Sequence, residues 1–286
     1  MFFKSIQYFV YFFYFYFKHL KFCSDFCRSI VYKSIFVHSS RITLKAITVV
    51  KKDVSKSYRA VLFDFDDTIS DSSAGKRAAL IRVAHILKRD TQTALGLEKI
   101  VEELYTIEEE MNASTSYDRT KWWPEAGKRL GFDVDSATSL RATIGYWTTF
   151  TRHQKPFPDA IKVLSELKKR GYSLGMVTDT DGQAGIKRWR VCSSPLFDYF
   201  EVVVVAGDDT RRTKPDPKAF VFCAQKLDVN PSEALFVGDK PYTDIKGAKN
   251  AGMDAALVNR RGWSKIEGAD YIVNSLSEIL KILNGF

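Results

Sequence analysis

The chain has 286 residues, 45% of them hydrophobic and 27% charged, a composition that is ordinary for a globular protein and excludes collagen-like and wholly disordered chains. Most of its formal net charge of +9 lies in residues 1–57, which hold 10 Lys and Arg against 2 Asp, whereas residues 58–286 hold 33 Lys and Arg against 32 Asp and Glu. The nearly neutral body therefore gives no support for a nucleic-acid partner.

Residues 1–57 form an aromatic, basic extension that differs from the rest of the chain. They contain no Gly, Pro or Glu but hold 10 of the 21 Phe and 5 of the 13 Tyr. The uncharged stretch at residues 5–17 is shorter than the roughly 20 residues of a membrane span, and no small-residue cleavage site follows it. A misassigned start, a disordered tail and a peripheral anchor or signal all stay open, so membrane contact is expected only if this extension is real and ordered.

Five short apolar runs predict buried strands of a parallel sheet that is covered on both faces. They are rich in Val, Leu and Phe, and comprise Ala60–Phe63, Tyr172–Val177, Phe200–Val205, Ala234–Val237 and Ala255–Val258. Helical patterns at Asp159–Arg170, Pro217–Leu227 and Asp244–Ala251 precede or separate the last four runs. This βαβ order predicts a doubly wound, Rossmann-like α/β core.

One long interval breaks the βαβ order. Between residues 71 and 155 there is no strand run, only helical patterns at Ala74–Lys88, Leu97–Met111 and Ser136–Phe150. An interval of this length is not a loop of a compact domain. We therefore expect an all-helical second domain at residues 71–155, inserted after the first strand of a catalytic core made of residues 58–70 and 156–286.

Acidic residues directly follow the first predicted strand. Asp64 and Asp66 are two residues apart, so an extended backbone directs both carboxylates to the same side, and Asp67 adds a third acid. Such a concentration of charge at a sheet edge is costly unless a cation compensates it. Mg²⁺, which favours a few carboxylates with water and phosphate oxygens, would do so; an Asp-rich turn with helix-capping roles is the alternative.

Polar residues also follow later strands of the predicted sheet. Thr178 follows the second run, and Asp239 follows the fourth, with Asp244 five residues further on. Between them, Pro215 biases Lys214 towards an extended backbone at the entrance of a helix. Because ligand sites in open α/β sheets lie outside the carboxyl ends of the strands, we expect these side chains to converge with the first acidic pair.

Together these motifs resemble a known superfamily. Asp-x-Asp-x-Thr at residues 64–68, Thr178 after a strand, Lys-Pro-x-Pro at 214–217 and Gly-Asp-x-x-x-x-Asp at 238–244 resemble, in order, the four motifs of the haloacid dehalogenase-like hydrolases. The strings FDFDDT, KPDPKAF and VGDKPYTDIKGAKNAGM are similar to the phosphoglycolate-phosphatase-like branch, and the helical insertion is similar to that branch's cap. The resemblance covers about residues 58–286.

The resemblance implies a catalytic role for four residues. Asp64 would be the nucleophile that forms an aspartyl phosphate. Asp66 would protonate the leaving oxygen as a general acid and then activate water as a base. Thr178 and Lys214 would hold the oxygens of the transferring group and balance their charge.

The resemblance also implies a Mg²⁺ site. Asp64 and Asp239 would ligate the ion through their carboxylates, and Asp66 through its main-chain carbonyl. Asp244 would ligate the ion through water or would position Lys214. The ion would screen the acidic cluster and polarise the phosphoryl group.

Residues near the motifs receive structural interpretations at this stage. Asp179 and Asp181 are interpreted as caps of the following helix. The pairs Arg211-Arg212 and Arg260-Arg261 are interpreted as solvated faces, with binding of substrate anions as the alternative. In the helical insertion, the polar and aromatic cluster at residues 119–124 is the candidate for substrate contacts, with burial in the core as the alternative.

The implied function is Mg²⁺-dependent hydrolysis of a small phosphorylated metabolite, with phosphoglycolate as the default. A haloacid dehalogenase is disfavoured because it is expected to lack the second acid, Asp66. A phosphomutase is not excluded, and a phosphoacceptor switch would carry its acids on different strands and would have no long insertion. The thiols of Cys192 and Cys223, interpreted as buried and structural, predict a cytoplasmic location; the oligomeric state stays open.

Overall fold

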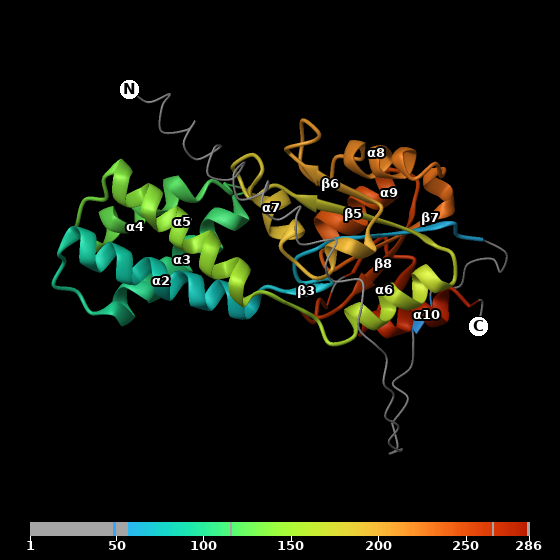
Figure 1. Ribbon diagram of the computed structural model, residues 1–286, viewed down its shortest axis with the longest axis horizontal. Coiled ribbons are helices and arrows are strands. Elements are labelled where there is room, and N and C mark those ends of the chain that lie inside the picture. The colour runs from blue at the N-terminus through green and yellow to red at the C-terminus, as the bar shows by residue number, and fades with distance from the viewer. Residues whose placement is uncertain (1–47, 50–56, 115, 265, 285–286) are drawn as a thin grey trace, which may run out of the picture. The chain divides into compact units, whose positions relative to one another are not determined.

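A seven-stranded sheet with helices on both faces forms the core of the computed structural model (Figure 1). The strand order is β1-β9-β8-β7-β2-β5-β6, and every pairing is parallel except that of β1 with β9. The strands are β1 (Thr48–Val49), β2 (Ala60–Phe63), β5 (Ser173–Asp179), β6 (Val202–Ala206), β7 (Ala234–Gly238), β8 (Asp254–Val258) and β9 (Tyr271–Val273).

The structure describes residues 48–49, 57–114, 116–264 and 266–284. The chain divides into two units, residues 1–45 and 46–286, and only the second contains described residues. Of the aromatic, basic extension, only residues 48, 49 and 57 are described, so the predictions made for it lie outside the described residues. Within the described part of the chain, no helix has the length and apolar character needed to cross a membrane.

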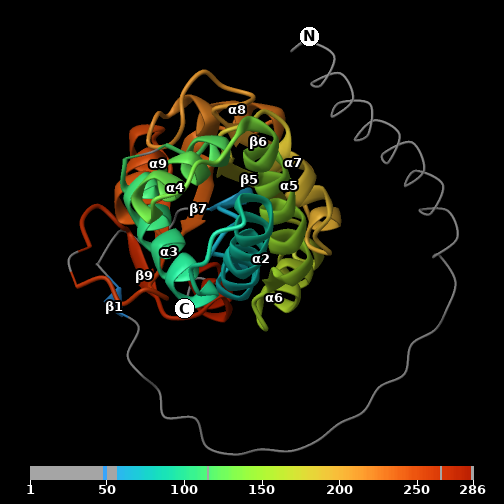
Figure 2. The ribbon, with the colours of Figure 1, turned by 90° about the vertical axis from the view of Figure 1, so that its left-hand side faces the viewer.

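The sheet is buried on both faces because its strands are apolar at nearly every position. In β2, Val61 and Phe63 belong to one hydrophobic cluster, while Ala60 and Leu62 belong to the cluster on the other face, as the two-residue period of a strand requires. Helices on the first side are α6 (Ala160–Lys169) and α10 (Ile279–Ile282), and those on the second are α8 (Lys218–Lys226) and α9 (Lys246–Asn250) (Figures 1 and 2). The predicted doubly wound α/β core is confirmed.

Four helices follow the first strand of the core and bury a cluster of their own. They are α2 (Ser73–Thr91), α3 (Leu97–Ala113), α4 (Trp122–Leu130) and α5 (Ser136–His153). The chain enters and leaves this helical insertion through β3 (Ser70–Asp71) and β4 (Lys155–Pro156), which pair antiparallel. The two crossings therefore run side by side, and Figure 2 views the molecule from the side of the insertion.

The predicted elements differ from the observed ones in several places. The predicted helix at Asp244–Ala251 is a π-helical turn at Pro241–Ile245 that continues into α9. Helix α7 (Ile186–Cys192) has no counterpart in the prediction, because its sequence IKRWRVC carries three cations and shows no clear apolar period. The short strand β9 was also missed, and its three residues give too little pattern to detect.

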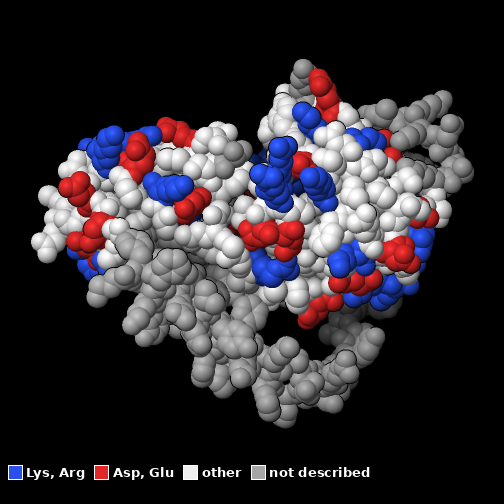
Figure 3. Space-filling view, turned by 90° about the horizontal axis from the view of Figure 1, so that it is seen from above, with Lys and Arg blue, Asp and Glu red and all other residues white. Residues whose placement is uncertain are grey.

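Charged side chains are interspersed on the surface of the described residues. On the face shown in Figure 3, Lys and Arg alternate with Asp and Glu over both the helical insertion and the core. This distribution agrees with the nearly neutral charge of residues 58–286.

Candidate active site

Three buried carboxylates meet at the carboxyl ends of β2 and β7. The register pairs Phe63 with Val237, so both strands end at the same level, with Asp64 and Asp239 just beyond them. Asp244 comes from the π-helical turn, and one oxygen from each of the three carboxylates lies within 4.8 Å of the others. A Cβ at Gly238 would approach the Asp244 side chain to 2.5 Å, so this position needs a glycine.

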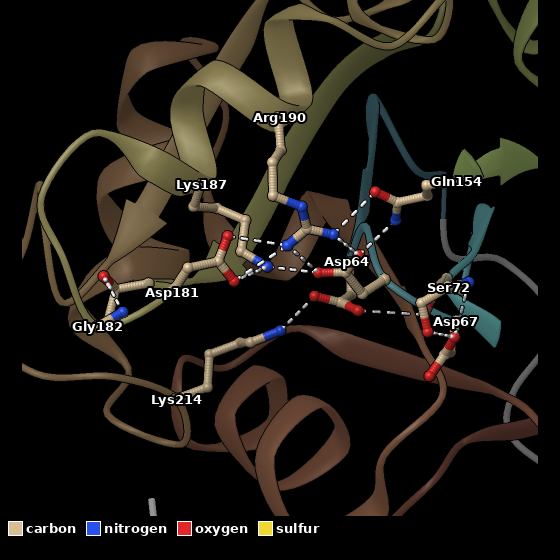
Figure 4. Close-up of polar contacts among 12 residues, drawn as sticks. Asp64, Asp67, Ser72, Gln154, Asp181, Gly182, Lys187, Arg190 and Lys214 are labelled. Carbon is tan, nitrogen blue, oxygen red and sulfur yellow. Dashed lines mark hydrogen bonds and ion pairs between the residues drawn. The ribbon is translucent and has the colours of Figure 1, made fainter. Parts of the chain in front are cut away.

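Lys214 places a cation between two of these carboxylates, and Figure 4 shows its contact with Asp64. Its Nζ donates to Oδ1 of Asp64 and to Oδ1 of Asp244, both at 2.6 Å, and to the carbonyl oxygen of Val177 at 3.3 Å. The backbone N–H of Lys214 donates to Asp179 at 2.8 Å, which holds the lysine at the end of β5. The ammonium group is therefore fixed from two sides of the site.

Burial and mutual repulsion disfavour the ionised forms of two of these carboxylates. Burial raises the pKa of Asp64 to about 6, against the opposing charge of Lys214. Burial and the charge of Asp244 raise the pKa of Asp239 to about 7. Burial would lower the pKa of Lys214, but the charges of Asp244 and Asp64 raise it well above its ordinary value. A further cation would stabilise the ionised form of these carboxylates.

Two threonine hydroxyls complete the floor of the site. Thr68 Oγ1 lies 3.4 Å from Asp64 Oδ2 and 3.3 Å from Asp239 Oδ1, between the ends of the two strands. Thr178, the residue before the last one of β5, is buried and lines the same cavity. Of the predicted site residues, the structure thus brings together Asp64, Thr178, Lys214, Asp239 and Asp244.

The carboxylate of Asp66 lies apart from that cluster and is bound by two cations of α7. Arg190 Nη2 donates to Asp66 Oδ1 at 2.6 Å, Lys187 Nζ contacts Oδ2, and Gln154 Nε2 donates to Oδ1 at 2.5 Å. Figure 4 labels these three partners. Burial would raise the pKa of Asp66, but the charges of Arg190 and Lys187 hold it well below its usual range. Asp66 is therefore ionised in this arrangement.

Asp179 and Asp181 do not cap the helix that follows them. The residue before α7 is Gly185, and no side-chain hydrogen bond caps this helix. Asp179 accepts instead from the backbone of Lys214, and Asp181 pairs with Arg190 at 2.8 Å and with Lys187 at 3.0 Å. The capping interpretation is wrong, because the two cations of α7 bind Asp181 and the backbone N–H of Lys214 binds Asp179.

Arg260 and Arg261 are more than a solvated face, because each pairs with an acidic side chain. Arg261 donates to Asp239 at 2.8 Å and contacts Asp67, and therefore closes one side of the acidic cluster. Arg260 pairs with Asp159 at 3.3 Å, and its guanidinium lies 3.7 Å from the centre of a phenylalanine ring. Neither role has a signal in the local sequence, because the partners are distant along the chain.

A cavity of about 390 Å³ extends from the acidic cluster to the helical insertion. Its volume is within the range of small-molecule sites. In the cluster at residues 119–124, Arg119 lines this cavity, whereas Trp122 is fully buried and packs its ring 3.6 Å from the Arg119 guanidinium. Trp122 is therefore part of the core, whereas a substrate contact of Arg119 stays a prediction.

Comparisons with known proteins agree with this geometry. The family model of the haloacid dehalogenase-like hydrolases matches residues 58–252. The glyceraldehyde 3-phosphate phosphatase of Methanopyrus kandleri is 31% identical over 210 residues, which cover 73% of this chain and 87% of that protein. Human N-acylneuraminate-9-phosphatase is 28% identical over 235 residues, which cover 79% of this chain and 93% of that protein.

Solved structures show the same likeness. A haloacid dehalogenase-type phosphatase from Thermococcus onnurineus is 33% identical with a TM-score of 0.60, covering 79% of this chain and 98% of its own. The magnesium-bound hydrolase YfnB from Bacillus subtilis is 25% identical with a TM-score of 0.64, covering 80% of this chain and all of its own. The similarity therefore spans almost the full length of each relative.

Proposed function

Because the chain belongs to the haloacid dehalogenase-like hydrolases and is a hydrolase of phosphate monoesters, we propose that it cleaves a small phosphorylated metabolite with Mg²⁺ through an aspartyl phosphate on Asp64. The observation that carries this proposal is the position of Asp64 at one end of the cavity, with Lys214 bonded to it and two further carboxylates beside it. The division into a core and a cap at residues 71–155 is part of the proposal.

The donor set fits Mg²⁺, which prefers oxygen ligands. Asp64 and Asp239 would hold the ion through their carboxylates and Asp66 through its main-chain carbonyl. Both oxygens of Asp244 already have partners, because Oδ1 accepts from Lys214 and Oδ2 from the backbone N–H groups of Asp239 and Lys240. Asp244 would therefore act by positioning Lys214 or through water. When bound, the ion would polarise the phosphoryl group and screen the acids.

The described side chains can perform the chemistry of phosphoryl transfer. The Asp64 carboxylate would attack phosphorus in line and displace the leaving oxygen, forming a mixed anhydride. Lys214 and the Thr178 hydroxyl would hold the phosphoryl oxygens as negative charge shifts towards the leaving group. Water would then attack the phosphorus and regenerate Asp64.

Asp66 must change its partners during this cycle. In the present arrangement it is ionised and bonded to Arg190 and Lys187, so it has no proton to donate and is a weak base. Donation to the leaving oxygen requires the carboxylate to turn away from both cations. Gln154 precedes β4, one of the two crossings to the insertion, and contacts both Asp66 and Arg190. A motion of the insertion would therefore move Gln154 and change the hydrogen bonds of Asp66.

We expect the purified protein to release inorganic phosphate from p-nitrophenyl phosphate in the presence of Mg²⁺ and to lose at least about 100-fold of this activity in excess chelator. Added Mg²⁺ should restore turnover and raise the melting temperature, because the ion binds the folded chain. Unchanged activity in chelator would contradict the metal-dependent mechanism. Halide release from a haloacid, or transfer of phosphate within a sugar phosphate, would instead favour the dehalogenase or phosphomutase alternatives.

Gly182 offers a test of the contact between the loop after β5 and the insertion. Its φ is +87°, and a Cβ there would lie 2.3 Å from the backbone N of Asp118 and 2.5 Å from the carbonyl oxygen of Tyr117. Gly185 has the same φ, but no atom within 4 Å of its Cβ position. We expect Gly182→Ala to lower kcat/KM for p-nitrophenyl phosphate roughly ten-fold, because Tyr117 lines the cavity and its backbone must shift.

Gly185→Ala is the matched control for this substitution. It carries the same backbone strain, about 1–3 kcal/mol, without the steric clash. Urea unfolding measures the shared strain, and steady-state kinetics measure the contribution of the contact. Equal kinetic losses in the two variants would show that the contact with residues 117–118 does not matter for turnover.

A further inference from the structure

Five residues that line the cavity have a buried polar side-chain atom without a hydrogen-bond partner among the described residues. Two of these atoms, Arg190 Nε and Thr243 Oγ1, belong to the core, and three belong to the helical insertion: Oε2 of Glu108, Nε of Arg119 and Nε1 of Trp147. The three residues come from α3, from the short helix at Arg119–Lys121 and from α5, and all three line the cavity that contains Asp64. Each is at least nine-tenths buried, with 2%, 6% and 4% of its surface exposed.

The three side chains form one group. Arg119 Nη2 lies 3.9 Å from Glu108 Oε1, and the Arg119 guanidinium lies 4.8 Å from the centre of the Trp147 ring. Glu108 Oε1 also accepts from the Tyr146 hydroxyl at 3.0 Å, and Arg119 Nη1 donates to the Tyr117 carbonyl oxygen at 2.9 Å. These bonds fix the side chains, yet leave one polar atom of each unused.

Buried polar groups in folded proteins nearly always have a hydrogen-bond partner, so several unpaired polar atoms in one cavity wall call for an explanation. A ligand that occupies the cavity would supply the missing partners. The atoms are shielded in this arrangement, and we expect the side chains to turn by small rotations as the ligand enters, which is common at binding sites.

The donor or acceptor character of these three unpaired atoms indicates the class of ligand. Arg119 Nε and Trp147 Nε1 are donors and need an acceptor, whereas Glu108 Oε2 is an acceptor and needs a donor. A hydroxyl group is both donor and acceptor, and a chain of hydroxyls can serve all three atoms. A carboxylate would satisfy the two donors but would leave Glu108 facing a like charge.

We propose that Glu108, Arg119 and Trp147 form a subsite for a polyhydroxylated leaving group, so that the substrates are phosphate monoesters of polyols or sugars. This inference rests on the proposed phosphatase function, since the cavity joins the subsite to Asp64. It also disfavours phosphoglycolate, whose leaving group ends in a carboxylate. Lys76, with its Nζ 4.0 Å from Glu108 Oε1, lies beside the subsite and partly offsets its acid.

The test compares esters that differ only in their hydroxyl groups. We expect kcat/KM of the full chain with Mg²⁺ to be at least about 100-fold higher for ribitol 5-phosphate than for pentyl phosphate, because sites built to bind hydroxyls reject analogues that lack them. Phosphoglycolate should be a poorer substrate than glycerol 3-phosphate of similar length. Equal values for ribitol 5-phosphate and pentyl phosphate would overturn the proposal.

Trp147→Phe keeps the ring and deletes the indole N–H, so it should lower the ribitol-to-pentyl ratio roughly five-fold, as expected for one hydrogen bond. Trp123→Phe is the matched control, because Trp123 donates to Thr143 within the insertion at 2.8 Å. It should lower stability and leave the ratio unchanged. The same ratio in Trp147→Phe as in the wild type, or an equal loss in both variants, would contradict a binding role for Trp147.

Failure of the subsite and failure of the phosphatase function give different results. Hydrolysis of p-nitrophenyl phosphate without discrimination between ribitol 5-phosphate and pentyl phosphate would contradict the subsite but not the phosphatase function. If no ester is hydrolysed, the subsite is still measured by thermal unfolding, where ribitol 5-phosphate should raise the melting temperature more than pentyl phosphate does. An equal rise with both esters would overturn the subsite by that route as well.

Discussion

Replacement of Asp64 by Asn is expected to lower the turnover of p-nitrophenyl phosphate by a factor on the order of 10⁴ or more, while the chain keeps its fold. An amide cannot form the covalent bond to phosphorus that the proposed mechanism requires. The fold should survive because Asn has nearly the same shape and Lys214 keeps its 2.6 Å contact with Asp244. Phosphate release measures the first expectation, and circular dichroism with urea unfolding measures the second.

Asp209→Asn is a suitable control for this variant. Asp209 follows β6, pairs with Arg188 on the surface and does not line the cavity, so its replacement should leave turnover unchanged. Residual activity of more than a few per cent in Asp64→Asn would place the nucleophile elsewhere. Loss of the folded state would leave the Mg²⁺ dependence of the wild type as the remaining test of the mechanism.

The sheet and the acidic cluster could be predicted because both follow from short-range rules. Apolar runs of four to six residues predicted the strands of the inner sheet, and parallel strands must place their carboxyl ends at the same edge. Asp64 and Asp239 therefore had to meet once Ala60–Phe63 and Ala234–Val237 were neighbours, as β2 and β7 are. The catalytic roles of these residues are still predictions.

The partners of Asp66 could not be predicted from local rules. Its carboxylate is bonded to Arg190 and Lys187, which are 124 and 121 residues away along the chain. The sequence did contain a signal, because the two cations are three residues apart and therefore share a face of α7, which begins at Ile186. The contact also depends on where Gln154 returns from the insertion, and the sequence gives no measure of that geometry.

The helical insertion was predicted as a set of helices but not as a binding surface. The patterns at residues 74–88, 97–111 and 136–150 correspond to α2, α3 and α5, whereas α4, which begins with two tryptophans and a proline, was missed. Helix packing decides which polar residues face the cavity. Glu108 has the sequence context of a solvated glutamate, in the run EEEM, yet it is 2% exposed.

Replacement of Lys214 by Met is expected to lower the free energy of unfolding by about 3–5 kcal/mol, because it removes the cation from two buried carboxylates. Lys214 is 6% exposed and bonds to Asp64 and Asp244 at 2.6 Å each. Turnover should fall at least about 100-fold in the same variant, since the phosphoryl oxygens lose a positive partner. Urea unfolding at neutral pH in the presence of chelator measures the stability effect without a contribution from metal.

A second substitution separates the charge of Lys214 from its packing. Adding Asp244→Asn to Lys214→Met removes one of the stranded carboxylates, so the double variant should regain part of the lost stability, as coupled neighbours do in a double-mutant cycle. Lys218→Met, four residues on at the start of α8, is the control and should change stability by less than about 0.5 kcal/mol. Additive losses from Lys214→Met and Asp244→Asn would show that the charges of these two residues are not coupled. Partial recovery would show that Lys214 stabilises the fold by compensating the charge of Asp244.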